Sequence, residues 1–153
     1  GLPAYEISNH ARPGAECRHN LLYWRYGEYV GVGAGAHGRL ALADGRHATA
    51  TELNPEKWLR QVEARGHGRV ADDLLTLEEQ GDEYLLMGLR LKEGIDLDRW
   101  EAISARVLDP SRLADLEKHG MVEEITDGEG RRKVRATPSG FAVLDAVVAD
   151  LAA

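Results

Sequence analysis

Apolar positions at helical spacing dominate the second half of the chain. They recur near the period of an α-helix over residues 77–91, behind a capping box that begins at Thr76. Asp96, Asp109 and Thr137 then precede three further apolar-periodic segments, and each is a residue type that caps helices. The pattern therefore predicts four helices in this half.

Two segments of strand-like pattern stand before the last of these helices. They flank the sequence DGEG and predict a β-hairpin over residues 121–136. Three helices, a two-stranded hairpin and a closing helix together are typical of a winged-helix-like domain.

The first half has a more irregular pattern. It predicts strands over residues 5–8 and 29–32, a helix over 17–26, a hairpin around Asp44, and a helix from Asn54 to Gly66. Short strands and helices mixed in this way predict an α+β fold.

Charge divides the chain at about the same place. Residues 1–69 carry nine Lys and Arg against seven Asp and Glu, whereas residues 70–153 carry ten against nineteen. Five of the six histidines also lie in the first part. A step of this kind predicts two domains, 1–69 and 70–153, and the acidic second one is a poor partner for nucleic acid.

The composition excludes two further classes of protein. There is no long apolar run, so we expect no membrane-spanning helix. The single cysteine, Cys17, allows no internal disulfide and suits a reducing, cytoplasmic setting.

One short segment, His19 to Trp24, gathers polar and aromatic side chains in the sequence HNLLYW. On a helix, His19 lies beside Tyr23, and Asn20 beside Trp24. Such a set can coordinate an iron or bond propionates, with its rings stacked on a tetrapyrrole. Periodicity alone favours the alternative, in which Tyr23 and Trp24 belong to the core.

A second segment, Gly31 to Gly38, reads GVGAGAHG. Glycine at alternate positions lets another backbone or a cofactor approach closely. The segment is not a P-loop, and the third glycine of a dinucleotide fingerprint falls at Ala36. A small-residue strand packed against a helix explains the pattern equally well.

Other candidate sites have weaker signals. Cys17 and His19 supply two ligands where a zinc site needs four, and a lone cysteine cannot hold an iron–sulfur cluster. The basic residues 130–135 stand where a winged helix touches DNA, but solvated charges on an edge strand explain them better in an acidic domain. We expect no nucleic-acid binding.

Longer segments resemble a known family. The run from Tyr5 to Trp24, with YVGVGAGAH after it, resembles the oxygen-independent coproporphyrinogen III oxidase-like proteins, which are radical S-adenosylmethionine (radical SAM) proteins. HNLLYW makes it more similar to the haem-chaperone (HemW-like) branch than to the coproporphyrinogen dehydrogenases. The segments LLMGLRLKEGIDL and TPSGFAVLDAVV resemble that family's C-terminal domain.

The resemblance implies a longer parent protein with a radical-SAM partial barrel, S-adenosylmethionine (SAM) and a [4Fe–4S] cluster held by three cysteines. This chain lacks the cysteine motif and opens on Gly1 rather than Met. We therefore expect it to be the C-terminal portion, with the end of the barrel in residues 1–69 and a winged-helix-like C-terminal domain in 70–153.

The resemblance also implies two sets of site residues. The haem-related motif falls on His19, Asn20, Tyr23 and Trp24, and the glycine strand near the SAM pocket falls on Gly31, Gly33, Gly35, Ala36 and His37.

The implied function is that of a coproporphyrinogen III oxidase-like protein in haem biosynthesis or haem delivery. An enzymatic parent would remove hydrogen from propionate side chains, and this chain alone is expected to be inactive. The alternatives are a haem-binding and transfer module without turnover, or a winged-helix adaptor. Porphyrin or haem is the expected partner, and exposed strand edges predict self-association.

Overall fold

The chain folds into two compact units, described over residues 1–153 by a computed structural model. One unit joins residues 1–26 to residues 77–153, and the other comprises residues 27–76. This division differs from the boundary near residue 70 that charge predicted. The opening residues form backbone hydrogen bonds with the segment after residue 88. The sequence pattern did not predict this long-range pairing.

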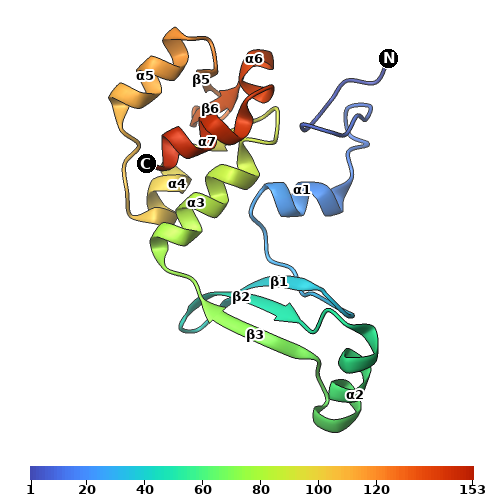
Figure 1. Ribbon diagram of the computed structural model, residues 1–153. Coiled ribbons are helices and arrows are strands. Elements are labelled where there is room, and N and C mark those ends of the chain that lie inside the picture. Colours follow the sequence, from blue (N-terminus) through green and yellow to red (C-terminus); the bar gives the residue numbers. More distant parts are fainter. The chain divides into compact units, whose positions relative to one another are not determined.

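The first unit contains most of the helices (Figure 1). Its elements are α1 (Arg18–Trp24), α3 (Leu77–Gly88), β4 (Ile95–Asp96), α4 (Leu97–Ser104), α5 (Pro110–Lys118), β5 (Val122–Thr126), β6 (Arg132–Ala136), α6 (Pro138–Phe141) and α7 (Leu144–Ala152).

The elements from α3 to α7 follow the predicted winged-helix-like order. β6 pairs antiparallel with β5 and with β4, a two-residue strand that the sequence pattern did not predict. Asp96 caps α4 by accepting a hydrogen bond from the Arg99 N–H at 2.9 Å. The predicted closing helix is divided into α6 and α7, because Val143 leaves helical geometry with a φ of −130°.

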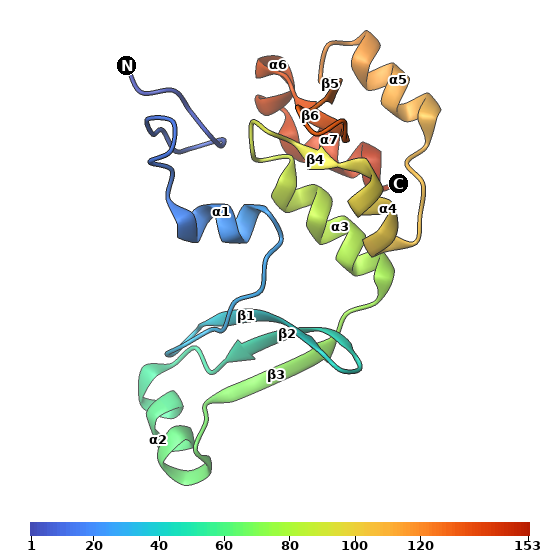
Figure 2. The ribbon, with the colours of Figure 1, turned by 180° about the vertical axis from the view of Figure 1, so that it is seen from behind.

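An apolar core holds these elements together. Its fully buried side chains come from α3, α4, the sheet and α7, and include Leu85, Leu89, Ile95, Trp100, Val134 and Val147. α3 and α7 lie side by side in it (Figure 2). Each such side chain stabilises the fold by about 1.5–3 kcal/mol. This core is the main source of stability in the first unit.

The strand predicted over residues 5–8 does not form. Its backbone makes two isolated bridges, between Ala4 and His10 and between Glu6 and Leu91. Tyr5 N–H donates back to the Asn9 carbonyl at 3.1 Å, so the segment folds on itself instead of extending along a partner strand. The bridge to Leu91 attaches the opening residues to the loop after α3.

The second unit is a three-stranded antiparallel sheet with one helix. Its elements are β1 (His37–Leu42), β2 (Gly45–Thr51), α2 (Pro55–Arg65) and β3 (Arg69–Leu74), with the strand order β1-β2-β3. The predicted hairpin and helix are both confirmed. Asn54 Oδ1 accepts from the Lys57 N–H at 3.0 Å, and Gly66 ends α2 in the left-handed conformation. β3 was not predicted.

No helix in the chain combines the length and the apolar character needed to cross a bilayer.

Candidate functional site

The predicted helix of the HNLLYW segment is present as α1, and it exposes His19. The imidazole packs edge-on against the Tyr23 ring, with 4.7 Å between centroids and 67° between planes. The two side chains are therefore neighbours, as their spacing predicted. The imidazole of His19 remains open to solvent.

Unlike His19, Asn20 and Trp24 both contact other side chains of the chain. Asn20 Nδ2 donates to the Tyr5 hydroxyl at 3.2 Å, which ties α1 to the opening segment. The Trp24 ring lies under the Arg90 guanidinium, 5.3 Å from its centroid. The Trp24 indole N–H is buried and has no acceptor. A buried donor without a partner is rare, so Trp24 has an unfilled hydrogen-bonding position.

The glycine-rich segment forms a turn rather than the predicted strand. Of the strand predicted over residues 29–32, only Tyr29 pairs in ladder fashion, and it exchanges hydrogen bonds of 2.8 and 2.9 Å with Arg39. Gly33 and Gly35 have φ values of 101° and 70°, which reverse the chain between Tyr29 and β1. Side-chain-bearing residues rarely adopt such values, so these glycines serve the turn.

Thr51 of β2 holds this turn in place. Its hydroxyl accepts from the Ala36 N–H at 2.8 Å and donates to the Gly33 carbonyl at 2.6 Å. Gly31 packs on the carbonyl of His37, where any Cβ would collide. The close approach that Gly31 allows is thus made by the chain's own backbone.

The second unit also contains a cavity of about 470 Å³ beside this turn. Gly31 and Gly33 line it, together with Thr51, Trp58 and His67. His37 is exposed at the start of β1. Of the predicted glycine set, Gly31 and Gly33 therefore border a hollow, and Gly35, Ala36 and His37 do not line it. The predicted set on α1 belongs to the first unit.

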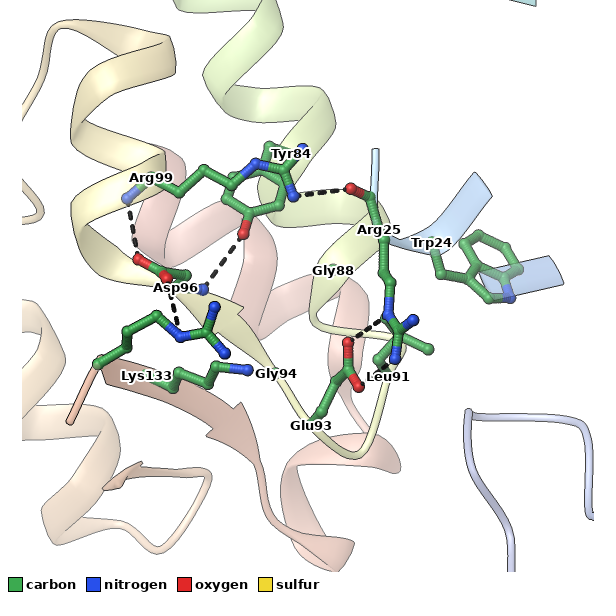
Figure 3. Close-up of a pocket in the computed structure, with 11 residues that line it drawn as sticks. Trp24, Arg25, Tyr84, Gly88, Leu91, Glu93, Gly94, Asp96, Arg99 and Lys133 are labelled. Carbon is green, nitrogen blue, oxygen red and sulfur yellow. Dashed lines mark hydrogen bonds and ion pairs between the residues drawn. The ribbon is translucent and has the colours of Figure 1, made fainter. Parts of the chain in front are cut away.

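A separate cavity of about 290 Å³ lies in the first unit, and Trp24 lines it (Figure 3). Four cationic side chains line it as well, against two carboxylates: Arg25, Arg99, Arg131 and Lys133 against Glu93 and Asp96. The sequence reasoning did not find this site. Its cations come from the C-terminal end of α1, from α4 and from the β5–β6 hairpin, so no local motif marks it.

Two of these cations are already engaged. Arg25 and Glu93 form two hydrogen bonds of 2.7 and 2.8 Å, and this pairing lowers the pKa of the Glu93 carboxyl. Arg131 bonds Asp127 at 2.8 Å. The pKa of Asp127 falls to about 2, chiefly because the Arg131 backbone N–H donates to it.

Arg99 is held differently. Its guanidinium donates to the carbonyls of Arg25 at 2.9 Å and Tyr26 at 3.4 Å, and it lies 4.8 Å from the Tyr84 ring centroid. Burial raises the pKa of the Tyr84 hydroxyl, which accepts a hydrogen bond from the Asp96 N–H at 3.2 Å. The Arg99 guanidinium therefore lies over the buried Tyr84 ring, and its side-chain hydrogen bonds go to main-chain carbonyls and not to a carboxylate.

The basic segment of the hairpin is largely neutralised. Arg132 lies 3.5 Å from Glu124, and Arg135 bonds Glu123 at 2.9 Å. These ion pairs fit the interpretation of solvated charges on a strand better than that of a DNA-binding wing.

A metal cluster does not fit the residues present. Cys17 is exposed, and no group of three or more His, Cys, Asp or Glu side chains converges. The chain cannot supply the three thiolates that a [4Fe–4S] cluster of the implied kind requires.

Comparison with known proteins agrees with the family resemblance. Residues 75–143 match the family model described as the HemN C-terminal domain. The heme chaperone HemW of Escherichia coli is 50% identical over 132 residues, which cover 83% of this chain and 33% of that protein. The mitochondrial radical S-adenosyl methionine domain-containing protein 1 of Danio rerio is 35% identical, over 97% of this chain and 34% of its own length.

A solved structure has the same fold. The structure described as coproporphyrinogen III oxidase (HemN) from Escherichia coli, a radical SAM enzyme, superimposes with a TM-score of 0.60 at 17% identity. The match covers 95% of this chain and 36% of that one. It confirms the α+β architecture. The chain spans about a third of the length of these relatives.

Proposed function

This chain belongs to the oxygen-independent coproporphyrinogen III oxidase-like radical SAM family, and from that premise we propose that it is a haem- or porphyrin-binding portion of such a protein. The parent would act in haem delivery or haem biosynthesis. Relatives named heme chaperone make delivery the first choice.

The observation that carries the proposal is the exposed imidazole of His19 braced by Tyr23 on α1. Neutral imidazole nitrogen is a common ligand of haem iron. Trp24, one turn further along, would pack against the macrocycle, and its unfilled N–H would reach a polar group of the ligand. Asn20, bonded to Tyr5, would act by fixing the orientation of α1.

We also assign the turn of Gly31, Gly33, Gly35, Ala36 and His37 to the neighbourhood of SAM in the parent. The cavity supports this assignment at Gly33, where the position of a Cβ is open space and a ligand can approach the backbone closely. When bound, SAM and the cluster would supply the radical chemistry.

The cluster itself would have to be held by cysteines outside this chain. The chain alone is then expected to bind but not to turn over porphyrin, which makes a binding and transfer role its own contribution. A single exposed Cys17 suits a reducing compartment such as the cytoplasm.

Haem titration tests the proposal. Haem added to the 153-residue chain should develop a saturable Soret absorption band, and His19→Ala should weaken the affinity about tenfold or more, which is ~1.4 kcal/mol per tenfold. Loss of one iron ligand is the physical reason.

His10→Ala is the matched control, since His10 is another exposed histidine of the first unit. It should leave the affinity unchanged. A chain that binds no haem, or an equal loss in both variants, would contradict the proposal.

A further inference from the structure

The cavity that Trp24 shares with four cations has a feature that no haem-ligating role explains. Lys133 reaches it from β6, and only 15% of its side chain is exposed. Its ammonium group has one carboxylate partner, Asp127, at 3.6 Å. That separation exceeds a normal hydrogen bond. The Lys133 ammonium therefore has no carboxylate at hydrogen-bonding distance, and its three N–H donors are available to an acceptor in the cavity.

The free positive charge at this point comes from Lys133 and Arg99. Of the four cations that line the cavity, Arg25 is paired with Glu93, and Arg131 with Asp127. Arg99 adds a guanidinium whose hydrogen bonds go to main-chain carbonyls, which leave its charge uncompensated. In Figure 3 the Lys133 side chain extends into the space between Glu93 and Asp96.

Glu93 and Asp127 do not neutralise this space. Glu93 is engaged by Arg25 in two short hydrogen bonds. Asp127 accepts from the backbone N–H groups of Glu129 and Arg131 and from the Arg131 guanidinium. Asp96, the other carboxylate in the lining, accepts from the Arg99 backbone N–H at 2.9 Å and lies 3.9 Å from the Arg131 Nε. These carboxylates are therefore largely used by other donors, and the site favours an incoming anion with oxygen acceptors.

We propose that this cavity binds a carboxylate group, with Lys133 and Arg99 as its cationic partners. The inference deepens the proposed function and rests on it in one respect: the carboxylate is a propionate of the bound porphyrin. Trp24 connects the two, because it belongs to the α1 set and also lines the cavity. A macrocycle packed on Trp24 can extend a propionate toward Lys133.

Carboxylate recognition is tested with sodium propionate alone. Backbone amide resonances of Gly88 and Gly94, which line the cavity, should shift saturably on titration, relative to sodium chloride at equal ionic strength. Lys133→Gln should weaken the binding about tenfold, through loss of a charge-assisted bond. Arg132→Gln is the matched control, because Arg132 is the preceding residue of β6, is exposed and pairs with Glu124.

Three results would overturn the carboxylate site: no saturable shift, an equal effect of both variants, or saturation by inorganic phosphate but not by propionate. Arg99→Gln provides a second test if Lys133→Gln does not fold by circular dichroism. If neither variant folds, the titration of the unmodified chain still decides.

Whether the bound carboxylate is a porphyrin propionate is tested with haem and with haem dimethyl ester, which lacks free propionates. Haem should bind about tenfold more tightly than the ester, and Lys133→Gln should remove most of that difference. Equal binding of haem and ester, with His19→Ala still weakening both, would overturn this inference and leave the proposed function intact. Absence of all haem binding would remove the proposed function, while the propionate titration would still report on the cavity.

Discussion

Single side chains decide several features of this protein through partners far away in sequence. His47 on β2 is one case: its Nδ1 lies 2.9 Å from Asp72 Oδ1 on β3, and its Nε2 lies 3.1 Å from Asp44 Oδ1 in the hairpin turn. The two carboxylates, with the bond to Asp72 as the largest cause, raise the pKa of His47 above its ordinary value. A doubly protonated imidazolium can donate to both.

This pairing predicts a pH-dependent second unit. Because the folded pKa lies above the unfolded one, the stabilisation is fully present below the unfolded pKa of about 6.5 and is lost as pH rises through the folded pKa. Amide exchange in β1 to β3 should therefore accelerate above neutral pH beyond the intrinsic base-catalysed rate. His47→Gln should remove this excess.

His67→Gln, in the same unit but without carboxylate partners, should preserve the excess and serves as the control. An unchanged pH dependence in His47→Gln would contradict the assignment.

At the scale of elements, caps and turns explain where helices begin and where the chain reverses. Asn54, Asp96 and Asp109 each accept a backbone N–H at a helix start, as their residue types predicted. The glycine turn is different, since its shape depends on Thr51, which comes 18 residues after Gly33.

Thr51→Val should loosen this turn with little change of volume. It removes the bonds to Ala36 and Gly33, and we expect a loss of about 1–2 kcal/mol in the free energy of unfolding of the second unit. Faster amide exchange at Ala36 would report it locally. Thr49→Val is the matched control, because Thr49 lines the same cavity without a bond to the turn. An equal effect at both positions would contradict the role of Thr51.

At the scale of the whole molecule, the two units differ in how much they bury. The first unit has a continuous apolar core, whereas the second leaves large apolar side chains exposed, with Val32 at 86%, Leu53 at 77% and Val30 at 67%. Val30 and Val32 line the same cavity, and we expect this exposed apolar surface to be an interaction surface.

We therefore expect the predicted self-association to use this apolar surface of the second unit. The 153-residue chain should sediment as concentration-dependent oligomers, and Val32→Asp should shift it toward the monomer by placing a charge in the buried contact. Val107→Asp alters an exposed valine of the first unit and should have no effect. Monomeric sedimentation at the highest attainable concentration would refute the prediction.

Local sequence determined most elements of this protein by itself. The capping residues, the Asp44 hairpin, the α1 pairing of His19 with Tyr23 and the winged-helix-like order all follow from residue types at short spacing. These signals are local because a cap or an i,i+4 pair involves neighbouring residues.

Tertiary structure decided what joins distant segments. The bridge of Glu6 to Leu91, the pairing of β3 with β2, and the absence of strands at residues 5–8 and 29–32 depend on partners that periodicity does not identify. The cationic cavity is likewise assembled from α1, α4 and β6. The positive potential of this cavity arises only when the fold brings those residues together, because electrostatic interaction depends on distance in space and not along the chain.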